Sequence, residues 1–408
     1  IIERDAKPTI GDIIRELPAV GRSASPNNSV GAGGIVAGNA GLDTVNLRHL
    51  GPLRTLVLFD GKRVIESNIN GQVDLGTLPT VLLDRVDVVT AGASAAWGSD
   101  AVAGVVNLVL NKSFSGVRAR IDSGNSYAAD HRSRRGELAW GTGFAQGRGQ
   151  VTLSASHLES PDVVFAGQRG WNTYPALMDN PAYTRGGNEP RYLWMSRTGL
   201  SQATTGGLIA GGPLAGTHFL GPDATPMPFD FGQVSGPISA GGDAEQRTAS
   251  LDNLTVAYRS TTLFAYSSYE LTDRLKLSVQ LSQGESRSRN SSVPVMRFGN
   301  LPIRRDNAFL PQVVKDRMAE LELDTIPVGT TNLNNLPEGH LTLSDLQETV
   351  GIPTATTRRR VRRGLLSLYG AVGNDWSWEA SYLRSEARVR QDVTSNLIPA
   401  HFNRAIDA

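Results

Sequence analysis

The sequence has no cysteine, and it has no apolar run approaching the roughly 20 residues that a membrane-spanning helix needs. Disulfides, thiolate metal sites and cysteine nucleophiles are therefore excluded. The net charge is only +1, so no bulk field would attract nucleic acid. The six histidines are scattered without HExxH or other paired metal spacing, and no nucleophile elbow or phosphate-binding loop is found. We expect no enzymatic activity, no metal site and no cofactor.

With 408 residues, the chain exceeds one average domain, and its 44 glycines suit turns and close packing better than long helices. A modest apolar content does not exclude a membrane, because a spanning β-strand needs only about 10 alternating residues. The chain starts at Ile1 and ends without a strand pattern, so we expect a piece of a longer protein.

Residues 1–113 predict a small mixed α/β unit. Thr9 is a candidate N-cap, and the apolar spacing after it predicts a short helix that stops at Pro18. A second short helix is predicted at 77–84. Strands are predicted at 42–47, 55–60, 62–65, 85–90 and 104–110, with Asp60-Gly61 as a hairpin turn.

From Gly116 onward the pattern alternates with period 2. The alternation is clearest at 275–282, where leucine and valine face one way and lysine, serine and glutamine the other. This alternation predicts an antiparallel sheet with one apolar and one polar face, in either a soluble sandwich or a membrane barrel. The seven predicted strands are 117–123, 134–142, 149–158, 260–271, 275–287, 362–372 and 376–388.

The connections between these strands favour the barrel. Three strand pairs are joined by short turns, whereas the connections at 159–259 and 288–361 are very long. Outer-membrane barrels have short turns at one rim and long loops at the other. Trp376 and Trp378 follow one short turn, and Tyr269 lies near another, as expected for an interfacial aromatic girdle. Ordinary core tryptophans are the alternative.

Several spaced motifs in the first quarter carry a resemblance. They are the strand–turn–strand RTLVLFDGKRV at 54–64, the strand RVDVVTAG at 85–92 and the closing strand GVVNLVLNK at 104–112. The small residues at 92–99 suit an element packed inside something larger. Together these motifs resemble the plug of TonB-dependent outer-membrane transporters. Departures are His49-Leu50 before Gly51, Asp87 in place of glutamate, Ala93 in place of proline and Trp97 in place of tyrosine.

This resemblance implies a plug domain at 1–113, followed at 114–408 by a partial antiparallel transmembrane β-barrel. About seven strands of a larger barrel of about twenty-two would be present, with extracellular loops at 159–259 and 288–361. The implied activity is active uptake of a scarce nutrient across the outer membrane of a Gram-negative bacterium. The implied partners are TonB with ExbB–ExbD, outer-membrane lipid and lipopolysaccharide, and a small-molecule or oligosaccharide ligand, with no nucleic acid.

The resemblance also suggests roles for particular residues. Arg54, Arg85 and Asp87 would form an electrostatic latch between plug and wall, with solvated surface charge as the alternative. Ligand contacts are expected from outward plug loops, which would otherwise be simple polar loops. The candidate ligand residues are Arg48, His49, Glu66, Ser67, Asn68 and Asn70.

Two further features leave alternatives open. The loop 159–259 has Phe165, Trp171, Tyr174, Tyr183, Tyr192 and Trp194 among polar residues, which suits sugars, aryl compounds or planar chelates. The basic run 358–363 could bind lipopolysaccharide phosphates or simply be solvated. A soluble carbohydrate-binding or carbohydrate-active β-protein and a passive porin remain the competing functions. The substrate itself is not fixed: siderophores, corrinoids, oligosaccharides and aromatic compounds all fit.

Overall fold

The computed structural model describes residues 9–26, 38–90, 92–220, 224–244, 253–291, 296–331, 353–373, 376–395, 398, 400, 403 and 404. Its contacts divide the chain into two compact units. The first comprises 1–164, 253–290 and 355–392, and the second comprises 165–252, 291–354 and 393–408. No helix among the described residues combines the length and the apolar character needed to cross a bilayer.

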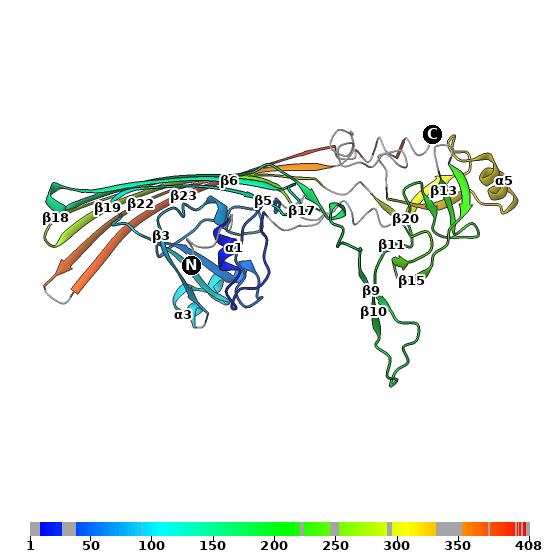
Figure 1. The fold of residues 1–408 in the computed structure, drawn as a ribbon, viewed down its shortest axis with the longest axis horizontal. Coiled ribbons are helices and arrows are strands. Elements are labelled where there is room, and N and C mark those ends of the chain that lie inside the picture. Colours follow the sequence, from blue (N-terminus) through cyan, green and yellow to red (C-terminus); the bar gives the residue numbers. More distant parts are fainter. Residues whose placement is uncertain are drawn as a thin grey trace. The chain divides into compact units, whose positions relative to one another are not determined.

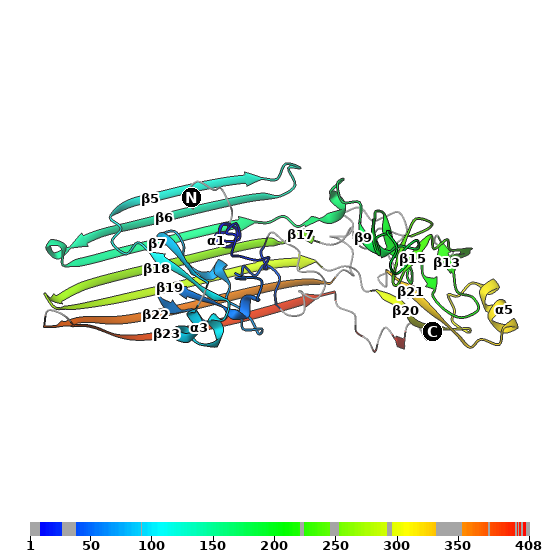
Figure 2. The ribbon, with the colours of Figure 1, turned by 90° about the horizontal axis from the view of Figure 1, so that it is seen from below.

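The first unit is built on a seven-stranded antiparallel sheet in the order β23-β22-β19-β18-β7-β6-β5 (Figure 2). All seven strands predicted from the alternating pattern are present, and each is longer than predicted. The partial antiparallel sheet expected after the plug is thus confirmed. Its strands are β5 (Gly116–Asn125), β6 (Arg132–Phe144), β7 (Gly149–Ser160), β18 (Ala257–Thr272), β19 (Leu275–Ser291), β22 (Thr354–Val372) and β23 (Trp376–Thr394).

The two faces of this sheet differ in chemistry. One face, called here the inner face, is buried and mostly polar, and its serines, threonines and arginines alternate with exposed residues along each strand. The opposite, outer face presents exposed apolar side chains over the part of the sheet nearest the short turns. Among them are Val117, Ile121, Leu138, Trp140, Leu153, Leu263, Leu281 and Leu366. An apolar outer face and a polar inner face are the pattern of a membrane barrel wall.

Aromatic side chains gather where the strands meet their short turns. Phe144 and Tyr269 stack with ring centroids 6.0 Å apart. Trp376 is 78% exposed and Trp378 is 40% exposed, so neither indole packs in the core of the described structure. Their position matches the predicted girdle, because exposed amphipathic rings are favoured at a lipid–water interface.

The N-terminal part of the first unit has a four-stranded sheet in the order β2-β1-β4-β3. The central pair β1 and β4 is parallel, and both strands are almost fully buried because their apolar runs have no polar face. Thr9 caps α1 as predicted, accepting a hydrogen bond from Asp12 N. The elements are α1 (Ile10–Ile14), β1 (Thr55–Phe59), β2 (Lys62–Arg63), β3 (Leu83–Val89), α3 (Ala93–Trp97) and β4 (Gly104–Leu110), with 3₁₀ turns at Pro52–Arg54, Leu75–Thr77 and Ser99–Ala101.

Two predicted elements are wrong. Residues 42–47 are buried but form no strand, because their backbone groups bond to side chains and loops: Asp43 N donates to Asp74 Oδ1, and Leu47 N donates to Thr55 Oγ1. Residues 77–84 form no helix. A 3₁₀ turn ends at Thr77, and Leu83 already pairs with Leu110 at the start of β3. Most of the predicted loop 25–41 lies outside the described residues.

The second unit shows that the two long connections fold. It has a five-stranded sheet, β14-β13-β12-β21-β20, on which α5 packs through Val314 and Met318. Smaller sheets are β11-β16-β15 and β10-β9. The elements are β9 (Ala176–Asp179), β10 (Tyr192–Met195), β11 (Thr198–Leu200), β12 (Leu208–Ile209), β13 (Thr217–Leu220), β14 (Thr225–Pro228), β15 (Gln233–Ser235), β16 (Ile238–Ala240), β20 (Arg297–Arg304), α5 (Gln312–Glu320) and β21 (Thr325–Thr330); β8 (Val164–Phe165) pairs with β17 (Asn253–Thr255).

Candidate functional site between plug and sheet

The plug domain packs on the inner face of the seven-stranded sheet (Figure 1). Phe264 and Tyr266 of β18 join the apolar core of the plug, and Phe264 meets Phe59 edge-on at 6.3 Å. Most other wall residues at this contact are small and polar, and they are listed here: Thr152, Ser154, Ser260, Thr262, Ser278, Gln280, Ser286 and Ser288. A few aromatic contacts therefore sit within a largely polar interface.

Asp74 lies at the centre of the polar contacts near the end of the sheet from which the long connections leave, called here the loop end; the opposite end, with the short turns, is the turn end. Its carboxylate is fully buried and accepts hydrogen bonds from Ser286 Oγ of β19 at 2.7 Å, Asp43 N at 3.1 Å and Gly76 N at 3.0 Å. Three donors compensate much of the cost of burying this charge. One of the three comes from the wall, so the plug carboxylate is held partly by the sheet.

Arg359 of β22 is the largest fully buried side chain in the described structure. Its guanidinium donates to Ala40 O at 2.8 Å and to Gly38 O, both in the plug, and its Nη1 lies 3.9 Å from Asp74 Oδ2. Among the described residues, Nε and Nη1 have no hydrogen-bond acceptor. A buried cation paired at this distance contributes little net stability, but removing either partner leaves an uncompensated charge.

A second buried carboxylate, Asp43, lies next to this cluster inside the plug. Its Oδ1 accepts from Arg15 at 2.8 Å, and Arg15 also pairs with Asp12 at 2.6 Å. Desolvation by complete burial raises the pKa of Asp43 from about 3.8 to about 6, against the opposing effect of Arg15, while the nearby carboxylates Asp12 and Asp74 add to the rise. The protonated form of this carboxyl group is therefore favoured in the folded plug.

Further contacts lie toward the turn end of the sheet. Asp60 accepts from Lys112 at 2.7 Å and from Gln280 of β19 at 3.3 Å. The guanidinium of Arg363 lies 5.4 Å from the centre of the Phe59 ring. A more exposed ion pair joins Lys62 to Glu379 of β23 at 2.8 Å. Contacts at this end therefore join the plug to three neighbouring strands, β19, β22 and β23.

Gly284 of β19 lets the plug approach the wall at the backbone level. A Cβ atom there would lie 1.8 Å from Thr77 O and 2.7 Å from Thr77 Cα. Real Cβ atoms do not approach other atoms so closely, so only glycine fits while the plug stays in place.

The predicted latch residues lie on the plug surface. Arg85 pairs with Asp87 at 3.0 Å and Asp84 at 3.3 Å, and Arg54 donates to Leu50 O. The structure brings Arg85 and Asp87 together, but the contacts described for these residues do not reach the seven-stranded sheet. The polar contacts with the wall are made by Asp74 and Asp60 instead.

Part of the predicted ligand set forms one loop. Asn68 holds residues 67–72 together: its side chain accepts from Gln72 N at 2.9 Å and donates to Asn39 Oδ1 at 3.0 Å, to which Asn70 also donates. Glu66 is exposed, whereas Ser67 is fully buried and accepts from Asp74 N. Arg48 and His49 form a separate exposed turn with positive φ, and Arg48 donates to Thr90 O.

Sequence reasoning missed Asp43, Asp74, Arg359 and Gly284. One signal was available for Arg359: within the basic run 358–363, alternation places 359 and 363 on the face opposite to 358, 360 and 362. The acidic partners had no signal, because Asp74 and Ser286 lie 212 residues apart in sequence.

Comparison with known families agrees with this architecture. Residues 1–105 match the family model described as TonB-dependent Receptor Plug Domain. The N-terminal part of this chain therefore matches the plug domain of TonB-dependent receptors, which confirms the resemblance drawn from the sequence.

Solved structures with a similar fold include the siderophore receptor PirA from Acinetobacter baumannii, with 12% identity, 96% of this chain and 44% of that chain covered, and a TM-score of 0.40. BauA, the ferric preacinetobactin receptor of the same organism, has 11% identity, coverages of 95% and 46%, and a TM-score of 0.39. Fiu, the ferric-catecholate import receptor from K12 E. coli, has 13% identity, coverages of 96% and 45%, and a TM-score of 0.38. The chain thus spans less than half the length of these receptors.

Proposed function

We propose that the full-length protein takes up a scarce nutrient across the outer membrane. The ligand is captured on the loop side, and TonB with ExbB–ExbD, driven by the proton gradient, displaces the plug so that the ligand passes along the inner face of the wall. No chemistry is performed on the ligand. The ligand class is a small molecule such as a siderophore or corrinoid, an aromatic compound, or an oligosaccharide.

The observation that carries this proposal is the polar inner face beneath the plug. A domain meant to stay in place would be expected to bury apolar side chains against its support. Here Gln280, Ser286 and Ser288 can exchange their bonds with the plug for bonds with water. A neutral hydrogen bond contributes only about 0.5–1.5 kcal/mol net, and a bond to a carboxylate such as Asp74 or Asp60 contributes about 1.5–3 kcal/mol, so the interface can be separated stepwise and then hydrated.

Ligand capture is assigned to the loop formed by Asn39, Asn68 and Asn70 on the plug, with Glu66 beside it. Its amide groups combine donors and acceptors, and Ile69 at its tip is 83% exposed. Such a loop can bind either hydroxyl-rich or chelate ligands through hydrogen bonds. The role of Arg54, Arg85 and Asp87 as a latch remains a proposal for the complete barrel, whose other strands would face them.

The test uses the full-length protein in its own cell. Deleting the gene should abolish growth on one limiting nutrient, and inactivating TonB should have the same effect. Transcript levels under iron starvation and on individual carbon sources would select the nutrient to use. Deleting residues 1–113 should leave a pore that leaks without TonB. Unchanged permeability after this deletion, or uptake that continues without TonB, would contradict the proposal.

The plug match disfavours the two competing functions. A passive porin has no use for a domain held in its lumen by buried charges, and the outer face of the sheet is too apolar for a soluble sandwich. Solubility tests the argument against a soluble sandwich, because the full-length protein should require detergent to remain monodisperse.

A further inference from the structure

Along the strands β19, β22 and β23, the outer face changes from apolar to basic at a similar distance from the short turns. Toward the turn end it presents Leu281, Leu366 and Tyr382, all exposed. Toward the loop end the same face has eight arginines against three carboxylates, Glu285, Glu386 and Asp392. The arginines are Arg287, Arg289, Arg358, Arg360, Arg362, Arg384, Arg388 and Arg390.

The level of this change matches the outer boundary of a lipid bilayer. Arg362 is about ten residues from the turn that follows β22, and the first charged residues on the outer face of β23, Arg384 and Glu386, are about eight and ten residues from its start. Ten residues at about 3.3 Å each, tilted by about 40°, rise roughly 25 Å, which is the height of the apolar band of outer-membrane barrels. The first charged residues on the outer face of β6 and β7, Arg134 and Glu159, lie at the same distance from their turn.

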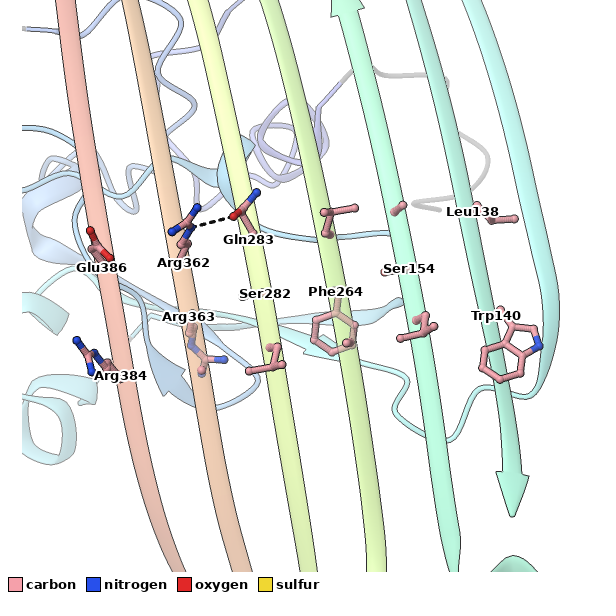
Figure 3. A pocket seen from close by; sticks show the side chains of 16 residues that line it. Leu138, Trp140, Ser154, Phe264, Ser282, Gln283, Arg362, Arg363, Arg384 and Glu386 are labelled. Carbon is pink, nitrogen blue, oxygen red and sulfur yellow. Dashed lines mark hydrogen bonds between the residues drawn. The ribbon is translucent and has the colours of Figure 1, made fainter.

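A hollow of about 820 Å³ lies on this face at the boundary (Figure 3). Leucines and a tryptophan from four strands form its apolar part: Leu138, Trp140, Leu153, Leu263 and Leu281. Arg362, Arg384 and Glu386 line its other side, with Arg362 donating to Gln283 at 2.9 Å. The hollow therefore combines a surface for an acyl chain with guanidinium groups for an anion.

The positive charge here is only partly neutralised by the protein. Glu285 already accepts from both Arg358, at 2.6 Å, and Arg360, at 2.8 Å. Among the described residues, Arg384 has no ion-pair partner, and Arg362 has only the neutral amide of Gln283. Guanidinium groups bind phosphates through paired hydrogen bonds, and the excess of arginine favours an anionic ligand over a neutral one.

We propose that this surface, made by Arg360, Arg362, Arg384 and Arg388 with the adjoining hollow, binds a phosphorylated lipid of the outer leaflet, lipid A being the source of phosphate at that level. The phosphate lies between Arg362 and Arg384, and one acyl chain lies over Leu281 and Trp140. The inference rests on the outer-membrane placement in the proposed function, but it does not depend on transport.

The test measures binding of purified lipid A to the full-length protein in a neutral detergent at about 0.15 M salt. Arg362→Gln/Arg384→Gln should weaken binding at least tenfold, because two charge-assisted contacts are lost. Arg304→Gln/Arg317→Gln, which removes the same charge from arginines of the second unit, is the matched control and should bind like the wild type. Dephosphorylated lipid A should lose affinity for the wild type to a similar extent.

Further measurements distinguish a lipid site from a site for free anions and from misfolding of the variants. Inorganic phosphate and pyrophosphate should bind at least a hundredfold more weakly than lipid A; equal binding would show a site for free anions and overturn the lipid. Trp140→Ala should weaken lipid A binding without changing any pyrophosphate binding. A circular-dichroism spectrum and heat-dependent gel mobility like those of the wild type are required of each variant, and Arg384→Gln alone serves if the double variant fails to fold. Equal binding by the double variant and its control refutes the site, whereas loss of uptake with intact lipid binding would refute only the transport proposal.

Discussion

Replacing Gly284 by alanine should loosen the plug from the wall. The added Cβ would lie 1.8 Å from Thr77 O, where van der Waals contact requires about 3.2 Å, so the plug backbone must retreat by more than 1 Å. Overpacking of this kind costs roughly 1–3 kcal/mol. Because the clash exists only while the plug is seated, that cost should raise the population of the displaced plug by about 5- to 150-fold.

Two measurements on the full-length protein test this reasoning. Hydrogen exchange should speed up at Thr77 N and Leu78 N, whose bonds to Asp74 O and Leu75 O form the turn at the contact. Conductance across planar bilayers without ligand should also increase. Gly364→Ala on β22 is the control, because its Cβ would meet only Leu281 Cδ2 at an ordinary 3.5 Å. If Gly284→Ala and Gly364→Ala behave alike in both measurements, the close approach at Thr77 does not hold the plug.

Four other changes test the remaining contacts. Arg359→Met should lower the free energy of plug unfolding by about 3 kcal/mol, because Gly38 O and Ala40 O lose a buried donor and Asp74 loses the cation that lies 3.9 Å away. Urea unfolding followed by a fluorophore on the plug would detect this loss. A loss under about 1 kcal/mol would contradict the role of Arg359. Asp43 has a raised pKa, so its protonated form is favoured in the folded plug. Wild-type stability relative to Asp43→Asn should therefore fall by about 3 kcal/mol as pH rises from about 4 to 7, and a pH-independent difference would be inconsistent with this burial. Lys62→Gln should change stability by less than about 1 kcal/mol, since the pair with Glu379 is partly exposed, and a larger loss would show that we underestimate this contact. Asn68→Ala should weaken ligand binding at least tenfold in equilibrium titrations while Lys62→Gln leaves it unchanged, and equal affinities would remove this loop from the ligand site.

The sequence was sufficient for the seven long strands, because residues alternating over ten or more positions leave an unmistakable period of 2. It was also sufficient for β1, β3 and β4, whose apolar runs are bounded by turns. It failed where side chains replace a backbone ladder, as at Asp43 and Leu47, and where Leu83 pairs with Leu110 instead of continuing a helix. The second unit was missed because strands such as β12 have two residues and carry no period.

The candidate site was the least predictable part. A buried cluster of Asp74, Ser286 and Arg359 joins three segments that are far apart in the chain, and no local pattern marks such a meeting. Glycine spacing likewise does not show which glycine meets another backbone. The polar loop around Asn68, in contrast, was predicted from composition, since asparagine bonded to its own backbone is typical of tight turns.

The length of β22 and β23 has a consequence for where a nutrient is first met. Each has 19 residues, about twice the number that a bilayer crossing requires. In a receptor embedded as proposed, the extra half of each strand raises the entrance roughly 20 Å above the headgroups. A diffusing molecule would then encounter the vestibule in open water, clear of the dense layer of sugars nearest the surface, and a bulky cargo would not have to push that layer aside.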